Sequence, residues 1–367
     1  IINNAFGVNL NKSINVTGIL TLTNGAFTVG ANTLTINNPI AGTVANLSAN
    51  NTSSITVAGT AAGVNIPASV SQLNNLTVSN TIGSSLQGNM KVFGTLFITA
   101  TAGNVDADLF TLDGTGNLTM NGGNLIMAKN GVVLPELTGA YSLSGGTVTF
   151  NGVGITVSDA QTIRPVNYFN LASTDDGDRI LSSTGTIGVA NVFTPHTNVY
   201  FISGSTVNFN KTTAGQTIPA FTFNNIRISG GGSVTKTLAG HINIEGTLGI
   251  AAFTKLELSA FNATLRSNAT TGTANVDVIP TANSITYSGS GRFIVERYLP
   301  VGTTHAKSWQ FLAAPSKGQT INAAWQEGNV LPAVGTPGLG TILSTNNTGG
   351  TGFDIIGGVA PSIKTFN

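Results

Sequence analysis

A short pattern recurs along this chain and constrains its fold more than any other feature. The pattern is Asn-Asn-apolar-x-apolar, a glycine-rich break, and then apolar-x-Gly-Thr-Leu. It reads Asn-Asn-Leu-Thr-Val at 74–78, leading to Val-Phe-Gly-Thr-Leu at 92–96. A second copy reads Asn-Asn-Ile-Arg-Ile at 224–228, leading to Ile-Glu-Gly-Thr-Leu at 244–248. Short strands that recur in this way, each closed by a turn, are typical of stacked coils and not of a globular domain.

The spacing of the copies predicts the length of one coil. Degenerate copies at 16–20 and 189–193 place equivalent positions at Gly18, Gly94, Asn191 and Gly246. The gaps between these positions are close to four, five and three times a coil of about 19 residues, and about 14 or 15 such coils would fill the region. We therefore predict an all-β fold, a parallel β-solenoid of the right-handed β-helix type, in which each strand pairs with its equivalents above and below.

Hydrophobic alternation indicates which side chains face the core. In the run 33–36, Leu34 and Ile36 fall on one face, and Thr33 and Thr35 fall on the other. We expect Leu, Ile, Val and Phe to form stacked inner columns, with Leu96 among them, and Thr, Ser and Asn to cover the outside. Burial of such columns contributes about 25 cal/mol per Å².

The composition excludes several classes of protein. Only 8% of the residues are charged, compared with about 25% in ordinary soluble domains. The net charge of +1 and a mean hydropathy of +0.23 argue against disorder, which goes with low hydrophobicity and high net charge. Lys and Arg are scattered, so we expect no nucleic-acid partner. No apolar run approaches the roughly 20 residues of a spanning helix, so we expect no direct membrane insertion.

The sequence pattern changes near residue 290. We interpret residues 1–292 as the solenoid domain and residues 293–367 as the start of a second, truncated and mostly β module with one short helix, predicted at 319–327. We interpret Arg292, Glu296 and Arg297 as a cap on the open end of the solenoid and not as a functional patch. The chain opens without an initiator methionine or a signal peptide, so we expect it to be part of a longer protein.

Three segments of the second module resemble a module of very large Bacteroidetes surface proteins. They read Glu-Arg-Tyr-Leu-Pro at 296–300, Trp-Gln-Phe-Leu-Ala-Ala-Pro at 309–315 and Thr-Ile-Asn-Ala-Ala-Trp-Gln-Glu-Gly at 320–328. The Gly-, Thr- and Asn-rich sequence of residues 18–38 is similar to the β repeats of that family. The resemblance implies export by the type IX secretion system, with the translocon and outer-membrane machinery as partners during export. It also implies an extracellular, cell-surface location and a part in adhesion or gliding motility.

The most acidic stretch is Asp-Asp-Gly-Asp-Arg at 175–179. Closely spaced carboxylates on a turn suit Ca²⁺, so Asp175, Asp176 and Asp178 are the candidate metal ligands. The stretch is shorter than a calcium loop, however, and Arg179 offsets its charge. The three histidines, His196, His241 and His305, have no metal-like spacing. We therefore interpret the acidic stretch as a solvated turn and expect neither a metal nor a cofactor.

An enzyme is the main alternative to a structural role. A carbohydrate-active β-helix enzyme, either a polysaccharide lyase or a glycoside hydrolase, would place carboxylates together on one face. Glycoside hydrolysis requires two of them about 5–10 Å apart. The residues to test first are Asp106, Asp108, Asp175, Asp176 and Asp178. Because the 14 acidic residues do not recur at coil spacing, we expect no enzyme and assign no catalytic residue.

The function favoured by these observations is mechanical. We expect a structural and adhesive extracellular stalk whose repeated polar faces make weak, multivalent contacts with surface glycans or polysaccharides. Tyr168, Phe169 and Tyr200 are aromatic candidates for sugar contact, although alternation favours packing of some of them into the core. A third hypothesis is that the chain is a passive substrate of a secretion system.

Overall fold

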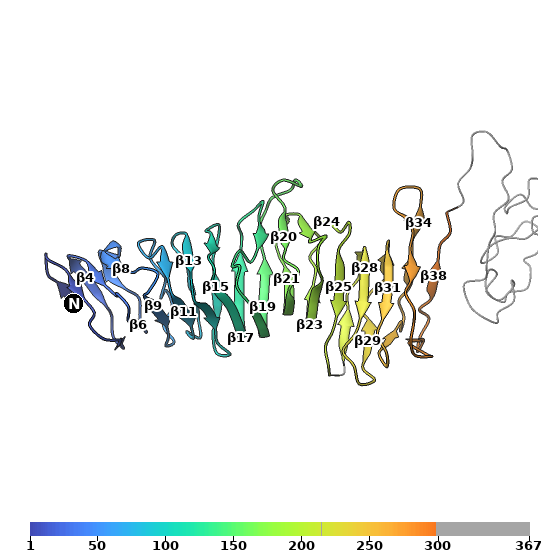
Figure 1. Cartoon of the computed structure of the whole chain (residues 1–367), viewed down its shortest axis with the longest axis horizontal. Coiled ribbons are helices and arrows are strands. Elements are labelled where there is room, and N and C mark those ends of the chain that lie inside the picture. The colour runs from blue at the N-terminus through green and yellow to red at the C-terminus, as the bar shows by residue number, and fades with distance from the viewer. Residues whose placement is uncertain (214, 299–367) are drawn as a thin grey trace, which may run out of the picture. The chain divides into compact units, whose positions relative to one another are not determined.

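The computed structural model describes residues 1–213 and 215–298, which wind into a parallel β-solenoid (Figure 1). Each coil lays its strands beside the equivalent strands of the coils before and after it. All strand pairs in this part of the chain are parallel except one hairpin, formed by β34 (Ser267–Asn268) and β35 (Gly272–Thr273). The predicted all-β solenoid is therefore confirmed. The helix predicted at 319–327 lies outside the described residues.

One sheet, here called the main sheet, runs through all the coils. It has 15 strands, and 13 of them follow one another along the stack, about one per turn of the solenoid. These are β3 (Ile14–Val16), β6 (Thr33–Ile36), β9 (Ser54–Val57), β11 (Asn75–Val78), β14 (Thr95–Ile98), β17 (Asn117–Met127), β19 (Tyr141–Phe150), β21 (Asn167–Ser173), β23 (Ile187–Thr194), β25 (Thr206–Phe209), β28 (Asn225–Ile228), β31 (Thr247–Ile250) and β36 (Asn275–Val276). The remaining two, β12 (Gly83–Ser85) and β15 (Asn104–Asp106), extend the sheet beside β17.

Shorter sheets close the other sides of the coils. The first coils carry β1 (Ile2–Asn3), β4 (Thr21–Asn24) and β7 (Ala41–Gly42), then β2 (Val8–Asn9), β5 (Phe27–Thr28) and β8 (Leu47–Ser48), with the 3-10 helix η1 (Val44–Asn46). The middle coils carry β10 (Gln72–Leu73), β13 (Met90–Val92) and β16 (Leu112–Asp113), then β18 (Val133–Leu134), β20 (Gln161–Ile163), β22 (Arg179–Leu181) and β24 (Tyr200–Phe201). The last coils carry β26 (Gln216–Ile218), β29 (Thr235–Leu238), β32 (Lys255–Glu257) and β37 (Ile285–Thr286), then β27 (Phe221–Phe223), β30 (Ile242–Ile244), β33 (Ala263–Leu265) and β38 (Phe293–Val295).

The strand register gives the length of each coil. Leu34 pairs with Ile14 of the preceding coil, and Tyr141 pairs with Leu118. Both steps exceed the predicted coil length of about 19 residues, the second by more than the first, because the corners between strands take up additional chain. The longer coil accounts for the smaller number of turns, about 13 instead of 14 or 15.

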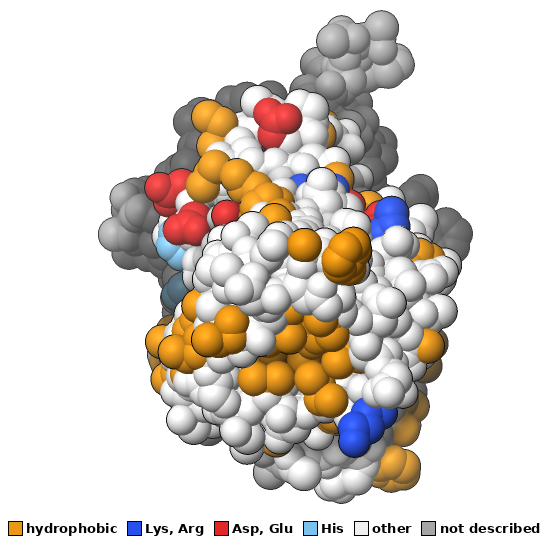
Figure 2. Space-filling view, turned by 90° about the vertical axis from the view of Figure 1, so that its left-hand side faces the viewer, with side chains coloured by type: hydrophobic (Ala, Val, Ile, Leu, Met, Phe, Trp, Pro, Cys, Tyr) orange, Lys and Arg blue, Asp and Glu red, His pale blue; other side chains and the backbone are white. Residues whose placement is uncertain are grey.

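The core is a continuous stack of apolar side chains inside the coils. Leu34, Ile36 and Leu96 are at most 1% exposed, as the alternation predicts, whereas Thr33 and Thr35 face outward. Figure 2 looks onto the N-terminal end of the stack, where hydrophobic side chains gather in the centre and are surrounded mostly by backbone and by side chains that are neither hydrophobic nor charged. No helix in the described residues has the length and apolarity needed to span a bilayer.

The last described coil extends past residue 292. Strand β38 pairs in parallel with β33, and the compact unit that holds all of these coils ends at Tyr298. The carboxylate of Glu296 binds Arg266 of the preceding coil at 2.7 Å and accepts the N–H of Ser267 at 3.1 Å. These contacts tie the final strand to the coil before it. The rest of the predicted second module lies outside the described residues.

Candidate functional site

The main sheet changes width at β23. Strands β17, β19, β21 and β23 contain 7 to 11 residues, whereas β25, β28 and β31 contain 4 each. Strand β25 pairs with β23 only at residues 187–189. Residues 191–194 of β23 are therefore not paired with a strand on that side within the described part of the chain. We call this step between wide and narrow coils the seam.

The shorter sheets also change at the seam. Strand β24 is the last strand of its sheet, and β27 is the first strand of the sheet that follows. Each has a strand partner on only one edge among residues 1–213 and 215–298. The stacking of these shorter sheets is interrupted here, and the interruption leaves a depression in the surface.

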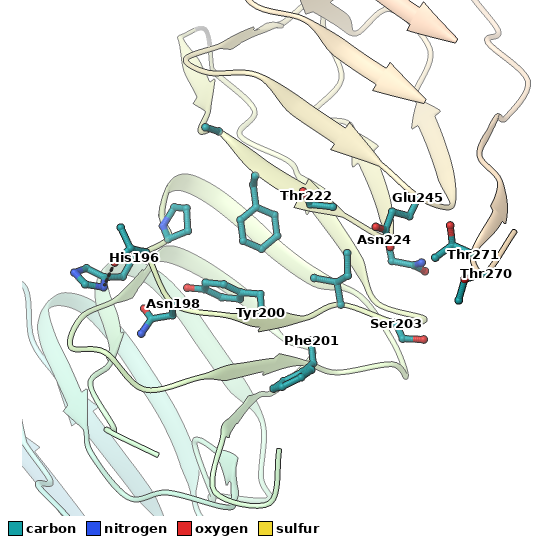
Figure 3. A pocket seen from close by; sticks show the side chains of 15 residues that line it. His196, Asn198, Tyr200, Phe201, Ser203, Thr222, Asn224, Glu245, Thr270 and Thr271 are labelled. Carbon is teal, nitrogen blue, oxygen red and sulfur yellow. Dashed lines mark hydrogen bonds between the residues drawn. The ribbon is translucent and has the colours of Figure 1, made fainter. Parts of the chain in front are cut away.

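This depression is a groove of about 1180 Å³, here called the seam groove. It is lined by the turn after β23, by β24 and the loop that follows it, by β27 and by the tip of the β34–β35 hairpin. Figure 3 shows His196 and Asn198 at one end of the groove, Thr270 and Thr271 at the other end, and Tyr200 between them. Segments that lie far apart in sequence thus meet at one place.

Aromatic rings form an ordered cluster beneath the groove. The ring of Phe221 lies edge-on to the rings of Tyr200, at 4.9 Å between centroids, and of Phe193, at 5.3 Å. It also lies 4.8 Å from the ring of Phe223. The hydroxyl of Tyr200 donates to Oγ of Ser173 at 2.7 Å, and burial raises the pKa of this phenol. Such packing fixes the rings before any ligand arrives.

The polar side chains of the groove keep unused hydrogen-bonding capacity. Oδ1 of Asn224 accepts the N–H of Gly204 at 3.1 Å and Nδ2 of Asn225 at 3.2 Å. Its own Nδ2 donates to no group in the described part of the chain. The carboxylate of Glu245 likewise has no hydrogen bond or ion pair with any described residue. Amide and carboxylate groups therefore remain available to a ligand.

The two groups of candidate catalytic carboxylates lie far apart. The pairing of Asp106 with Ile126, of Ile126 with Thr149 and of Thr149 with Ala172 separates them by three coils. Strands in successive coils lie about 4.8 Å apart, so Asp106 is on the order of 14 Å from the strand that leads into 175–178. That separation exceeds the roughly 5–10 Å between the two carboxylates of a glycoside hydrolase.

The first of these groups is a tight surface turn. Oδ1 of Asp106 accepts the main-chain N–H of Asp108 at 2.9 Å, and Asp108 has a left-handed backbone with φ of 48°. The nearby Asp113 pairs with Lys91 at 2.7 Å. The carboxylates of Asp106 and Asp113 thus serve local structure, and neither lines the seam groove.

Asp175, Asp176 and Asp178, the candidate calcium ligands, lie at the turn that we interpreted as solvated. Among residues 1–213 and 215–298, no group of three or more His, Cys, Asp or Glu side chains is arranged to hold a metal ion. Asp175 and Asp176 are exposed at a turn, whereas Asp178 is largely buried. Arg179, expected to offset their charge, is buried in the core, where its charge still interacts with Asp175 and Asp178.

Arg179 is fully buried and binds main-chain oxygens. Its guanidinium donates to five carbonyl groups at 2.7 to 3.1 Å. These carbonyl groups belong to Phe150, Gly152, Thr174, Gly177 and Asp178. Burial lowers the pKa of the guanidinium from its usual value. The hydrogen bonds of Arg179 satisfy main-chain carbonyl groups at a corner of the coil.

Lys236 is a second buried cation with the same role. Its Nζ donates to the carbonyl oxygen of Lys211 at the corner after β25. Desolvation, assisted by the charge of Lys211, lowers the pKa of Lys236 to about 8. Gln161 and Gln216 are also buried and donate to carbonyl oxygens of earlier residues, 25 to 34 positions before them, through Nε2. These groups are structural and do not open into the groove.

The remaining aromatic and histidine candidates fall into separate places. Tyr168 is fully buried, as alternation suggested, and Phe169 is half-buried. His196 lines the seam groove, whereas Nδ1 of His241 accepts the N–H of Asn262 in another coil. His305 lies outside the described residues.

Comparisons with known protein families, with curated proteins and with solved structures find no match. The site is therefore interpreted from its own geometry. Sequence reasoning missed Phe201, Phe221, Asn224 and Glu245, which line the groove. The only signal was that Asn224 and Glu245 belong to the second copy of the repeat pattern.

Proposed function

We propose that this chain is a structural and adhesive segment of a large extracellular surface protein. The observation that carries the proposal is the stack of about 13 turns on one continuous apolar core. A stack of this kind holds its surfaces at fixed, regular positions, because each coil contacts only its neighbours.

The outer face of the main sheet supports an adhesive role. In the first coils, Asn15, Thr35, Thr56 and Thr77 occupy one register position in successive strands. A shallow trough of about 420 Å³ follows this face, lined mainly by Thr, Ser and Asn side chains. Repeated neutral hydroxyl and amide groups offer many equivalent weak contacts, whose combined avidity exceeds that of any single one.

Export and location complete the proposal. Residues 296–300, 309–315 and 320–328 resemble a module of Bacteroidetes surface proteins. This resemblance supports the proposal that the protein is a type IX secretion substrate. Its partners during export are then the translocon and the outer-membrane machinery, and its final place is the cell surface. A part in gliding motility belongs to the same proposal.

Labelling of intact cells tests both parts. An antibody against residues 1–213, imaged by cryo-electron tomography with a gold label, should decorate fibres that project from the outer membrane. In a strain without the type IX translocon, the label should disappear from the surface while the protein accumulates inside the cell. Label confined to compact released particles would contradict the stalk, and unchanged surface label in the mutant strain would contradict the secretion route.

We propose that the chain acts without catalysis. The separation of Asp106 and Asp108 from Asp175, Asp176 and Asp178 by three coils supports this proposal. The alternative is a carbohydrate-active enzyme, and a reducing-end assay on a panel of polysaccharides distinguishes the two. Product release that is abolished by Asp176→Asn would overturn the proposal, whereas no product from any polysaccharide is the result expected.

A further inference from the structure

We propose that the seam groove binds a chain of neutral sugars. This inference rests on the proposed adhesive function and assigns it a discrete site, in addition to the repeated faces of the main sheet. Four properties of the groove carry it: its size, its aromatic surface, its free polar groups and its lack of positive charge.

The size of the groove suits an extended ligand. Small-molecule sites typically enclose about 300–1,000 Å³, and the seam groove, at about 1180 Å³, exceeds that range. It runs from the turn at His196 to the hairpin tip at Thr270 and Thr271 (Figure 3). A ligand that fills it is therefore a chain of several units and not a single small metabolite.

The aromatic surface suits the apolar faces of pyranose rings. Tyr200 and Phe221 are held by the edge-on ring contacts described above, so little conformational entropy is lost when a sugar stacks on them. Phe201 also lines the groove and is half-buried, which leaves part of its ring accessible. Flat, rigid rings of this kind make large contacts at low entropic cost.

The polar groups suit a ligand rich in hydroxyls. A sugar hydroxyl both donates and accepts a hydrogen bond, so it needs both kinds of partner. Nδ2 of Asn224 is a free donor and the carboxylate of Glu245 is a free acceptor in the described part of the chain, and both line the groove. The hydroxyl of Ser203 also lies at the lining and offers either role.

The charge of the groove excludes anionic ligands. None of its described lining residues is Lys or Arg, and Glu245 contributes a negative charge. An acidic polysaccharide, a nucleic acid or an anionic lipid surface would meet no Lys or Arg among these described lining residues. Neutral glycans are the hydroxyl-rich chains that remain.

A peptide added to the free edges of β24 and β27 is a less favourable occupant. These strands contain 2 and 3 residues, so strand addition would gain few main-chain hydrogen bonds. The side chains that line the groove would add little to the specificity of such a pairing. The peptide is therefore an outcome of the test and not the proposal.

Affinity electrophoresis of the full chain tests the proposal. Native gels are cast with soluble β-glucan, mannan or galactan, and with alginate as the anionic comparison. We expect at least one neutral polysaccharide to retard the protein, and alginate not to. Phe201→Ala should weaken that binding about tenfold, as truncation of an aromatic contact residue does. Glu245→Gln should weaken it several-fold, and Tyr287→Ala, which removes a 57% exposed aromatic ring outside the groove, should leave it unchanged.

Unchanged melting temperatures would show that the variants fold. The proposal is overturned if no neutral polysaccharide retards the protein, if both groove variants bind like the native chain, or if alginate binds more tightly. Binding of an alternating Thr-Val decapeptide can be measured by fluorescence anisotropy. If the native chain binds this peptide and Phe201→Ala does not, the groove is a peptide site and the proposal is overturned. If cells carry the surface label but the protein binds no glycan, this inference alone is contradicted. If the surface label is lost, the proposed function is contradicted.

Discussion

Oδ1 of Asn75 accepts a hydrogen bond from the main-chain N–H of Thr95, one coil further along, at 2.8 Å. Gly94, which precedes Thr95, makes room for this contact. A Cβ at Gly94 would lie 2.5 Å from Oδ1 of Asn75, closer than real Cβ contacts come. The Asn-Asn and Gly-Thr halves of the repeat pattern are thus two sides of one contact between coils.

The second copy of the pattern repeats this geometry. Oδ1 of Asn225 accepts the N–H of Thr247 at 2.9 Å, and a Cβ at Gly246 would lie 2.4 Å from the same oxygen. Stacked asparagines of this kind link coils through side chains in addition to the strand ladders. The pattern therefore reflects a packing requirement at the start of a main-sheet strand.

Replacing Gly94 with alanine should destabilise the coils around it. The added methyl group displaces the side chain of Asn75, so the contact with Thr95 is strained or lost, at a cost of about 1–3 kcal/mol. Urea unfolding of the variant measures this cost. Gly18→Ala is the control, because Gly18 follows β3 instead of preceding a main-sheet strand and nothing lies within 4 Å of the new Cβ; it should change stability little. Equal effects of the two substitutions would contradict this account of the pattern.

Burying a charge in the core should have a larger effect. Leu96 is 0% exposed, and a carboxylate in its place would lack any partner inside the coil. We expect Leu96→Asp to cost more than about 4 kcal/mol, which is exceptional for one substitution. Hydrogen exchange should show loss of protection in the strands around β14. Thr77→Asp, on the outer face of the neighbouring coil, should stay within about 0.5 kcal/mol of the native chain. Similar melting curves for the two variants would mean that Leu96 tolerates charge.

The repetitive part of the fold could be predicted from the sequence. The alternation at 33–36 identified the inner and outer faces, and the repeat pattern identified stacked parallel coils. Coil length was underestimated, because corners such as those between β17 and β19 contribute residues that carry no periodic signal. Local alternation specifies the strands but does not specify how much chain each corner holds.

The seam groove could not be predicted in the same way. It depends on where the wide strand β23 meets the narrow strand β25, and on which distant segments then line the step. The buried polar side chains near the corners were not predicted, although they share a sequence pattern. Gln161, Arg179, Gln216 and Lys236 each stand two residues before a buried Ile or Leu, in polar-x-apolar triplets. Gln, Arg and Lys side chains are usually exposed, so these residue types gave no reason to predict that the four side chains point inward.

Stability should rise with pH because of Lys236. Its pKa is about 8 in the folded chain and about 10.5 in the unfolded chain, so between these values the unfolded state binds more protons. The free energy of unfolding should therefore increase from about pH 8 to about pH 10.5, with the full penalty of the buried charge remaining below pH 8. Lys236→Gln should abolish this rise, because glutamine at the paired position, Gln216, donates to the carbonyl oxygen of Val189 without a charge.

Urea unfolding from pH 7 to pH 10.5 provides the comparison. Lys255→Gln, which removes an exposed lysine from the next strand, is the control and should keep the rise of the native chain. Other groups that titrate in this range are common to all three proteins and cancel in the differences. The same slope for Lys236→Gln and the native chain would show that Lys236 does not carry the penalty.

Glu257 should make the last coils sensitive to acid. Its carboxylate accepts Oγ1 of Thr286 at 2.6 Å, both the N–H and Oγ of Ser288 at 2.8 and 2.9 Å, and the N–H of Ser259 at 2.8 Å. These hydrogen bonds, that of Thr286 first, lower the pKa of Glu257 to about 2 from its usual 4.5. A carboxylate with a depressed folded pKa stabilises the chain above its unfolded pKa, and this stability is lost as pH falls from about 4.5 towards 2.

The loss should be local, because Glu257 joins β32 to the coil that contains β37. Hydrogen exchange at 256–258 and 285–286 should show protection in the native chain at pH 6 that decreases below pH 4.5. Glu257→Gln should show weaker protection at pH 6 and a smaller decrease on acidification. Glu245→Gln, which alters a carboxylate without a partner in the described chain, should follow the native profile. If Glu257→Gln keeps the full acid dependence, other groups hold this end of the stack together.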